Sequence, residues 1–502
     1  MSTMPLRYLS ATDLLRRFHD GEVSPLDVLE DQLDAAAATS DTVNCITFSH
    51  PDEAIRAAAE SERRWRTGRA RALEGITVAV KDESAVTGWT TTNGNRLRLD
   101  TVDDHDHPIV ARLREAGAVL HLQTTTPELS LNSTTWTDLW GVTRNPWNPE
   151  VTPGGSSGGS GAALAAGLTT LATGSDMGGS IRIPAAMNGL YGYKPPIGRV
   201  PGEPEDAQLF MATDGPLART FEDLVLFENA ISGPPPTSPI SLPRLDLPAT
   251  YPSVRGLRLA VQLELGGSPL EPDVRANTSA AVDRLADAGA EIVEVDLGWD
   301  VERIGAAVID GLMSTSIGAY LAEVLEVDRA AGGGTLNSYT ETYARLAAGN
   351  GGPVGYHRAA VAIAEMYASF RRHVVETGCA ALLCPTVVTT RVPADLDPLG
   401  PPLVVDGVAV AANVGWELTP AFNLLNRSPV VSVPTGLAAN GVPTGMQIVG
   451  DTFDELSVMR VAAAHAALAP ALFTGTRFPD PAAPGAPGPD RSPAADQDAR
   501  GS

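Results

Sequence analysis

The sequence predicts one large α/β domain built around an extended sheet. A strand, a helix and a second strand follow one another in GLRLAVQ, in the segment from about Pro272 to Ala288 that Gly289 ends, and in AEIVEVDL. Another strand is indicated by GITVAVK, residues 75–81, which alternates and is rich in β-branched residues. Of the 502 residues, 43% are hydrophobic, which is ample for a core. Large α/β enzymes of this length often form a single unit.

Helices and strands are expected along the whole chain. Residues 10–39 should form two helices that cover the sheet, the first capped near Ser10 and the second beginning at Ser24, with Pro25 in its first turn. The other expected helices lie at 53–69, 161–171, 220–231, 300–326, 355–376 and 453–468. The other expected strands lie at 118–122, 380–386, 428–436 and 444–450.

The remaining segments show little periodicity. Residues 124–147 are expected to be a long loop and residues 195–216 to be irregular. The domain is expected to span residues 1–478, with a catalytic core at about 70–230, a proline-rich crossover at 233–254, and a variable, substrate-shaping region at about 300–420 that includes the glycine-rich segment 328–353. The tail, 479–502, is expected to be disordered.

The most informative stretch is PGGSSGGSGAALAAGLTTLATGSDMGGSIRIPAAMNGLYGYK, which runs from Pro153 to Lys194. Two turns rich in glycine and serine flank a run of small and apolar residues. Glycine allows positive φ and lets backbone N–H groups approach an anion closely. The turns also contain three serine hydroxyls, those of Ser156, Ser157 and Ser180. The stretch therefore predicts a site where hydroxyls and free N–H groups face a ligand.

The runs GGSSGGS and GSDMGGSIRIP, together with Lys81 in the upstream strand ITVAVKD, resemble the amidase signature family of amide hydrolases. The twenty-four residues from Ser156 to Ser180 agree with the spacing of the family's bridging and nucleophilic serines. The similarity continues through TRNPWNPE and NGLYGYKP and returns in FNLLNRSPVVSVPTG and GMQIVG. The resemblance implies an α/β/α domain with a central mixed, mostly parallel twisted sheet covered by helices.

The resemblance also implies the catalytic roles. Ser180 would be the nucleophile that forms an acyl-enzyme, Ser156 would bridge it to Lys81 after a cis peptide bond from Gly155, and Lys81 would be the base. Such a relay requires Lys81 to be uncharged at rest, and therefore buried away from carboxylates. Because side chains alternate along a strand, Asp82 should face away from Lys81.

Further residues are expected around these three. The N–H groups that bind the oxyanion would be those of Met177, Gly178, Gly179 and Ser180. The residues that fix the two turns would be Asp176, Arg182, Gly155 and Ser157. The substrate pocket would be lined by Thr124, Leu131, Phe210, Met211, Trp416 and Phe422. This lining predicts an apolar or aromatic acyl group.

Three functions stay open at this point. The first is an amidase that acts on a carboxamide or a small acyl or aryl amide, and the second is an amidotransferase A-type subunit that releases ammonia from glutamine for a partner. The third is a non-catalytic binding protein that keeps the fold. A nucleophile elbow around Ser156 is disfavoured because NPWNPEVTP is no strand, and His465 in an alanine-rich helix is more simply a packed histidine.

Composition limits the partners and the compartment. The net charge of −24 disfavours nucleic acid, no apolar run is long enough for a membrane span, and three cysteines without ligand spacing fit a reducing compartment. Residues 103–107, DDHDH, precede Pro108 and are expected to cap a helix rather than bind a metal. We therefore expect a cytoplasmic protein without metal or cofactor that binds a small-molecule amide, with a homodimer left open.

Overall fold

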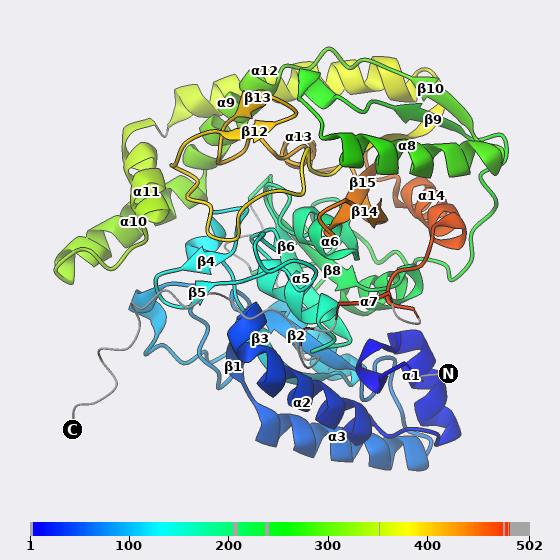
Figure 1. Cartoon of the computed structure of the whole chain (residues 1–502). Helices are drawn as coiled ribbons and strands as arrows, with labels where there is room; N and C mark the ends of the chain where they lie inside the picture. The colour runs from blue at the N-terminus through cyan, green and yellow to red at the C-terminus, as the bar shows by residue number, and fades with distance from the viewer. Residues whose placement is uncertain are drawn as a thin grey trace.

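Eleven strands form the central sheet of the computed structural model (Figure 1). They are β1 (Ile46–Ser49), β2 (Thr77–Lys81), β3 (Val119–Thr124), β6 (Leu171–Asp176), β7 (Tyr191–Lys194), β8 (Thr213–Ala218), β9 (Arg258–Val261), β10 (Glu291–Glu294), β11 (Cys379–Pro385), β14 (Val430–Leu437) and β15 (Pro443–Val449). Two small hairpins lie apart from it, β4 (Trp136–Thr137) with β5 (Gly141–Val142) and β12 (Leu403–Val405) with β13 (Val408–Val410). The structure describes residues 4–203, 209–235, 240–350, 352–474, 477–479 and 481.

The sheet is mixed, in the order β1-β3-β2-β6-β8-β7-β14-β15-β11-β9-β10. Its parallel pairs are β2 with β3 and β6, and β9 with β10 and β11, whereas the other neighbours run antiparallel. The predicted single α/β domain with a mixed sheet is confirmed. Parallel pairing is less extensive than expected, partly because residues 438–442, which join β14 to β15, are too few for the crossover that parallel strands need.

Helices pack on both faces of this sheet. They are α1 (Ala11–Asp20), α2 (Pro25–Val43), α3 (Pro51–Arg66), α4 (Pro108–Ala116), α5 (Gly158–Ala165), α6 (Arg182–Asn188), α7 (Phe221–Ile231), α8 (Pro272–Asp287), α9 (Val301–Met313), α10 (Ser316–Ala330), α11 (Ser338–Asn350), α12 (Pro353–Phe370), α13 (Ala421–Leu424) and α14 (Glu455–Leu468). Short 3₁₀ turns occur at η1 (Leu6–Tyr8), η2 (Arg96–Arg98), η3 (Glu128–Ser130) and η5 (Leu265–Gly267), and a π turn, η6 (Arg371–Val375), follows α12. In Figure 1 the N-terminal helices α2 and α3 lie beside β1 to β3, and α8, α9 and α12 lie at the opposite end.

Strand β2 shows how the two faces differ. Its Val78 and Val80 join the core that contains α1, α4, α7 and α14, whereas Ala79 joins the core around α5. Because side chains alternate along a strand, Lys81 shares the face of Ala79 and points toward α5. Helix α5 is buried along its whole length, so the Lys81 side chain enters the interior and not the solvent.

The predicted helix starts in the N-terminal region are confirmed. Ser10 accepts a hydrogen bond from the Asp13 N–H at the start of α1. Ser24 and Asp27 form a reciprocal capping box at the start of α2, with Pro25 in the first turn. The predicted strand–helix–strand succession is also confirmed, as β9, α8 and β10. The paired strands predicted near the C-terminus are β14 and β15, and the last predicted helix is α14.

The predicted helix over 161–171 is wrong. The helix there, α5, begins at Gly158 and ends at Ala165, and Gly167 follows with a φ of 72°, a left-handed conformation that ends helices. The chain then enters β6, which was not predicted. Helix 300–326 is likewise divided into α9 and α10, and α11 occupies much of the glycine-rich segment 328–353. The tail expected to be disordered lies, from residue 482 on, outside the described residues.

Among the described residues, no single helix is both long and apolar enough to cross a membrane. One pair, Val301–Met313 and Ile317–Ala330, meets the length and composition requirement only when both helices are taken together, and they are bent by 62° relative to each other.

Candidate active site

Lys81 ends β2 with its side chain only 1% exposed. Its Nζ donates hydrogen bonds to the Oγ of Ser156 at 2.7 Å and to the Oγ of Ser175 at 2.8 Å. Asp82 points elsewhere, as predicted, because its Oδ1 accepts a hydrogen bond from the Thr92 N–H at 2.8 Å. The structure therefore brings Lys81 and Ser156 together, although they are 75 residues apart in the chain.

The first glycine turn places Ser156 next to Lys81. The peptide bond between Gly155 and Ser156 is cis, as the family resemblance implied. A Cβ at Gly155 would lie 2.7 Å from the carbonyl carbon of Ser133, so this position has room only for glycine. Ser157 then precedes α5, and its N–H donates to the Ser180 carbonyl at 3.2 Å. This bond joins the first turn directly to the second.

The second turn follows β6 and is held by a buried ion pair. Arg182 donates from Nε and Nη2 to the two carboxylate oxygens of Asp176, each at 2.9 Å, and both side chains are fully buried. Burial alone raises the pKa of Asp176, but Arg182 and a hydrogen bond from Asn423 outweigh this effect and lower it. The carboxylate is therefore charged, and it fixes the start and end of the turn that carries Ser180.

The N–H groups of this turn are not equivalent. The Gly179 N–H donates to Asp176 Oδ1 at 2.8 Å, so the expectation that it is free for an oxyanion is wrong in this conformation. Within the described part of the chain, the N–H groups of Met177, Gly178 and Ser180 have no hydrogen-bond acceptor. These three are the donors that remain available to a ligand.

A carboxylate that the sequence interpretation missed touches the lysine. Glu83 Oε2 lies 2.5 Å from Lys81 Nζ and accepts hydrogen bonds from Ser175 Oγ at 2.8 Å and Ser130 Oγ at 3.0 Å. Burial alone raises the pKa of Glu83, but the charge of Lys81 and these hydrogen bonds lower it. The expectation that Lys81 lies away from carboxylates is therefore wrong. The chain turns after Lys81, with the Glu83 N–H bonded to the Lys81 carbonyl, and this turn brings Glu83 back to the amine.

A pocket of about 470 Å³ opens onto these groups. Its floor includes Glu83, Ser156, Ser175, Met177 and Ser180. Its walls add apolar side chains from several loops and from α10, namely Leu129, Leu131, Ile197, Val200, Leu209, Ile317 and Leu321. Polar and charged side chains are also present, among them Arg98, Asp103, His105, His107, Glu203 and Asp214.

The Amidase family model matches residues 27–459. An acylamidase from Rhodococcus erythropolis is 30% identical over 476 residues, which cover 94% of this chain and 97% of the relative. The chain belongs to the amidase signature family. It is an amidase, a hydrolase of carbon–nitrogen amide bonds.

Other members of the family support this assignment. The A-type subunit of the glutamyl-tRNA(Gln) amidotransferase from Symbiobacterium thermophilum is 31% identical over 486 residues, covering 91% of this chain and 96% of the relative. The solved structure of a bacterial aryl acylamidase of the amidase signature family has a TM-score of 0.84 at 27% identity and covers 93% of this chain and 97% of its own. A 6-aminohexanoate cyclic dimer hydrolase has a TM-score of 0.78 at 26% identity, with coverages of 92% and 98%.

The predicted pocket residues of this amidase are mostly wrong. Leu131 lines the pocket, but Thr124, Phe210, Met211, Trp416 and Phe422 are absent from its walls. Trp416 and Phe422 are fully buried in the core, where the Trp416 indole donates to the Ala412 carbonyl. Thr124 is bonded to the Ser160 hydroxyl behind the site. Trp416 and Phe422 are therefore core residues, and the apolar side chains of the walls come from segments outside residues 153–194.

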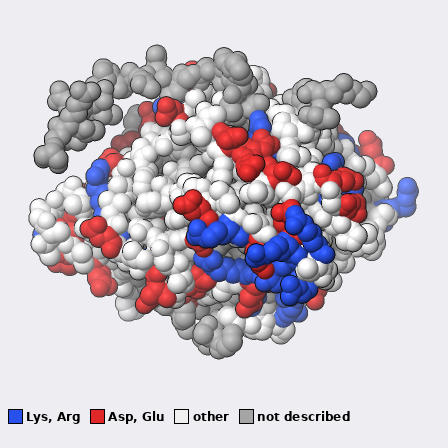
Figure 2. All heavy atoms as spheres, turned by 90° about the horizontal axis from the view of Figure 1, so that it is seen from below, with Lys and Arg blue, Asp and Glu red and all other residues white. Residues whose placement is uncertain are grey.

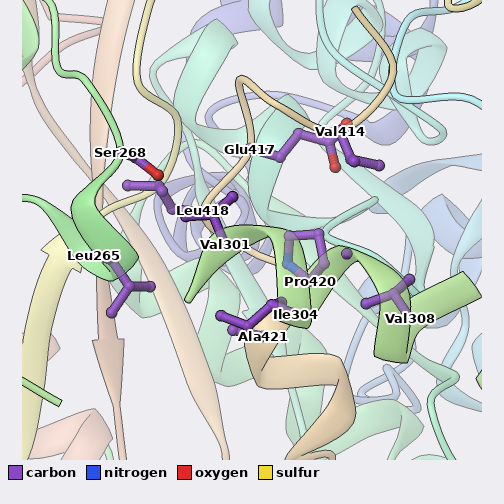
Figure 3. A pocket seen from close by; sticks show the side chains of 11 residues that line it. Leu265, Ser268, Val301, Ile304, Val308, Val414, Glu417, Leu418, Pro420 and Ala421 are labelled. Atoms are coloured by element: carbon purple, nitrogen blue, oxygen red, sulfur yellow. The ribbon is translucent and has the colours of Figure 1, made fainter. Parts of the chain in front are cut away.

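A second cavity of about 40 Å³ lies between η5, α9 and residues 414–421 (Figure 3). Its lining is apolar apart from Ser268 and Glu417. Burial raises the pKa of Glu417 to about 8. This cavity contains none of the predicted catalytic residues.

The acidic and histidine-rich segment before Pro108 caps α4, as predicted. The contact at the helix start is made by His107, whose Nδ1 accepts from the Ile109 N–H at 3.3 Å, and not by a carboxylate. His465, the rejected candidate base, is buried in α14 and its Nε2 lies 2.9 Å from the Pro434 carbonyl oxygen. Among the described residues, no cluster of three or more His, Cys, Asp or Glu side chains has a geometry that holds a metal.

Gly179 gives a stability test of the second turn. Its φ of 128° is rarely adopted by other residues, and a Cβ there would lie within 2.5 Å of the Thr419 Cβ. We expect Gly179→Ala to lower the free energy of unfolding by about 1–3 kcal/mol, measured by chemical denaturation. Gly178→Ala is the matched control, because nothing lies within 4 Å of its added methyl. Equal losses in the two variants would contradict the steric argument.

Proposed function

We propose that this amidase cleaves its substrate through an acyl-enzyme in which Ser180 is the nucleophile, Ser156 the bridge and Lys81 the base. The observation that carries the proposal is the 2.7 Å hydrogen bond between Lys81 Nζ and Ser156 Oγ at the floor of a pocket that Ser180 also lines. A lysine buried beside a serine hydroxyl is a group that can accept a proton when it is neutral.

The proton path follows from this arrangement. As Ser180 Oγ attacks the amide carbon, its proton passes to Ser156 while the Ser156 proton passes to neutral Lys81. The proton then returns by the same path to the leaving nitrogen, the C–N bond breaks, and the amine departs. Water repeats the attack on the ester carbon, which releases the carboxylic acid and restores Ser180.

The second turn supplies the charge stabilisation. The oxyanion that forms in each attack would accept hydrogen bonds from the N–H groups of Met177, Gly178 and Ser180. Asp176 and Arg182 lie behind the turn and hold it, so they act by positioning. Gly179 donates its N–H to Asp176, and because it has no side chain it fits beside Thr419.

A serine-directed fluorophosphonate probe tests the nucleophile. We expect intact-mass analysis to show one adduct on the wild-type protein, mapped to Ser180 by peptide digestion, and none on Ser180→Ala. Ser157→Ala keeps the nucleophile in the same pair of turns and should still be labelled. Labelling of Ser180→Ala to the wild-type extent would reject the assignment.

We propose an amide with an apolar or aromatic acyl group as the substrate class. The leucine, isoleucine and valine side chains around the pocket support this, and relatives described as an acylamidase and an aryl acylamidase agree with it. A panel of anilides, aliphatic carboxamides and glutamine tests the proposal. Turnover of glutamine alone would overturn it in favour of the amidotransferase function.

The amidotransferase alternative rests on relatives that are 31% identical. The net charge of −24 disfavours a nucleic-acid partner, but Figure 2 shows arginine side chains gathered on the face seen from below, since both lysines are buried. Helix α3, which lies on this side in Figure 1, carries Arg63, Arg64 and Arg66, and these pair with Glu60 and Glu62. This pairing reduces their attraction for nucleic acid, so the stand-alone amidase remains our proposal.

A further inference from the structure

The groups around Lys81 Nζ bear on its charge state. Its Nζ has three oxygen neighbours, Ser156 Oγ at 2.7 Å, Ser175 Oγ at 2.8 Å and Glu83 Oε2 at 2.5 Å. An ammonium has three N–H donors, whereas a neutral amine has two donors and one lone pair. A carboxylate oxygen can only accept, so the contact with Glu83 uses a donor of the lysine. A neutral amine could make the same contacts by accepting from Ser156, but the negative charge of Glu83 in contact with Nζ favours the ammonium.

Glu83 is held in this position from two further sides. Ser175 Oγ accepts from Lys81 and donates to the same Oε2 of Glu83, which closes a ring of three groups. Ser130 Oγ donates to Glu83 from η3, a segment that also lines the pocket. Because the carboxylate is fixed by neighbours other than the lysine, it stays beside Nζ whether or not the lysine is charged.

We propose that Glu83 keeps Lys81 in its ammonium form in the unliganded amidase and thereby sets the pH below which the site is inactive. This inference rests on the proposed role of Lys81 as the base. A protonated Lys81 cannot accept the Ser156 proton, so hydrolysis begins only after the lysine has lost its own proton. Glu83 is in this sense a positioning residue that acts on the reaction through Lys81.

The other charged groups nearby do not replace Glu83. Asp82 faces away and is bonded to Thr92, and Asp176 is engaged by Arg182. Burial lowers the pKa of His107 to about 4, so this neighbour of Glu83 is neutral around pH 7. Among the described residues, Glu83 is thus the one anion in contact with Lys81 Nζ.

The composition of the chain allows a direct test. The sequence contains only two lysines, Lys81 and Lys194, so ¹³C-lysine labelling gives two Cε resonances, and Lys81→Met identifies the one from Lys81. We expect the wild-type Lys81 signal to stay at its ammonium position at pH 7. In Glu83→Gln its titration midpoint should move down by at least about one pH unit, a tenfold change in the equilibrium. Glu203→Gln, which removes another pocket carboxylate whose histidine partner is His105, should leave the midpoint unmoved.

The outcomes separate this inference from the proposed function. A neutral Lys81 in the wild type at pH 7 would overturn the proposed role of Glu83, and this result needs no variant. An unchanged Lys81 titration midpoint in Glu83→Gln would overturn it as well. The acid limb of kcat/KM gives a second readout, and we expect it to shift to lower pH in Glu83→Gln. If that limb does not move while Ser180 still carries the serine probe, only the role of Glu83 is rejected. If Ser180 is not labelled, the proposed function itself fails.

Discussion

Replacing Lys81 by methionine is expected to lower kcat/KM for amide hydrolysis about 10²-fold to 10⁴-fold, the usual effect of removing a general base. Methionine fills a similar volume but cannot accept the Ser156 proton, so Ser180 loses the only path by which it is deprotonated in our mechanism. Steady-state kinetics on the best amide of the panel measures the loss. The rate of labelling by the serine probe should fall in parallel, because it depends on the same activation of Ser180.

The variant also leaves Glu83 without its cation, which by itself can destabilise the fold. The double variant Lys81→Met with Glu83→Gln separates the two effects. It should recover stability relative to Lys81→Met, but its activity should stay low because the base is still missing. Activity of Lys81→Met within tenfold of the wild type, in a folded protein, would remove Lys81 from the mechanism.

Replacing Arg182 by methionine is expected to lower the free energy of unfolding by about 3–5 kcal/mol, the range for breaking one side of a buried ion pair. The guanidinium is fully buried, and besides Asp176 it donates to the Thr419 carbonyl at 3.0 Å and to the side-chain oxygens of Gln447 and Asn423, both at 2.6 Å. Methionine would leave the side-chain oxygens of Gln447 and Asn423 without this donor, and it would leave Asp176 without its counter-charge in the interior. Urea denaturation measures the change.

A second variant identifies the source of this loss. In Asp176→Asn with Arg182→Met no unpaired charge remains, so the double variant should lose less stability than the sum of the two single variants. Arg182→Lys keeps the charge but not the planar set of donors, and should fall between the wild type and Arg182→Met. A loss below about 1 kcal/mol for Arg182→Met would show that the turn does not depend on this pair.

The sequence located the proposed reactive groups because they belong to a long motif. Only the joint spacing of the glycine turns and the upstream strand indicated that Lys81 and Ser156 meet, at a pocket that Ser180 also lines. Glu83 was missed for a physical reason. The strand ends at Lys81, and the turn that follows brings Glu83 back to the amine. Strand alternation, which was applied to Asp82, does not predict such a turn.

The parts that sequence reasoning missed depend on tertiary packing. Strand β6 was not predicted because its sequence, LATGSD, contains Gly174 and shows no regular alternation of apolar and polar residues. The pocket walls include η3, residues 197–203 and 209–214, and α10, which carry no shared motif. Trp416 and Phe422 are fully buried in the core, and no local sequence pattern predicts that placement.

The two lysines of this chain are both in its interior, and its other basic side chains are arginines and histidines. Amine-directed cross-linkers, dyes and activated resins would therefore find no lysine at the described surface. Attachment chemistry should instead target the abundant carboxylates. For the same reason, acylation of a lysine by such a reagent would report that the interior had opened.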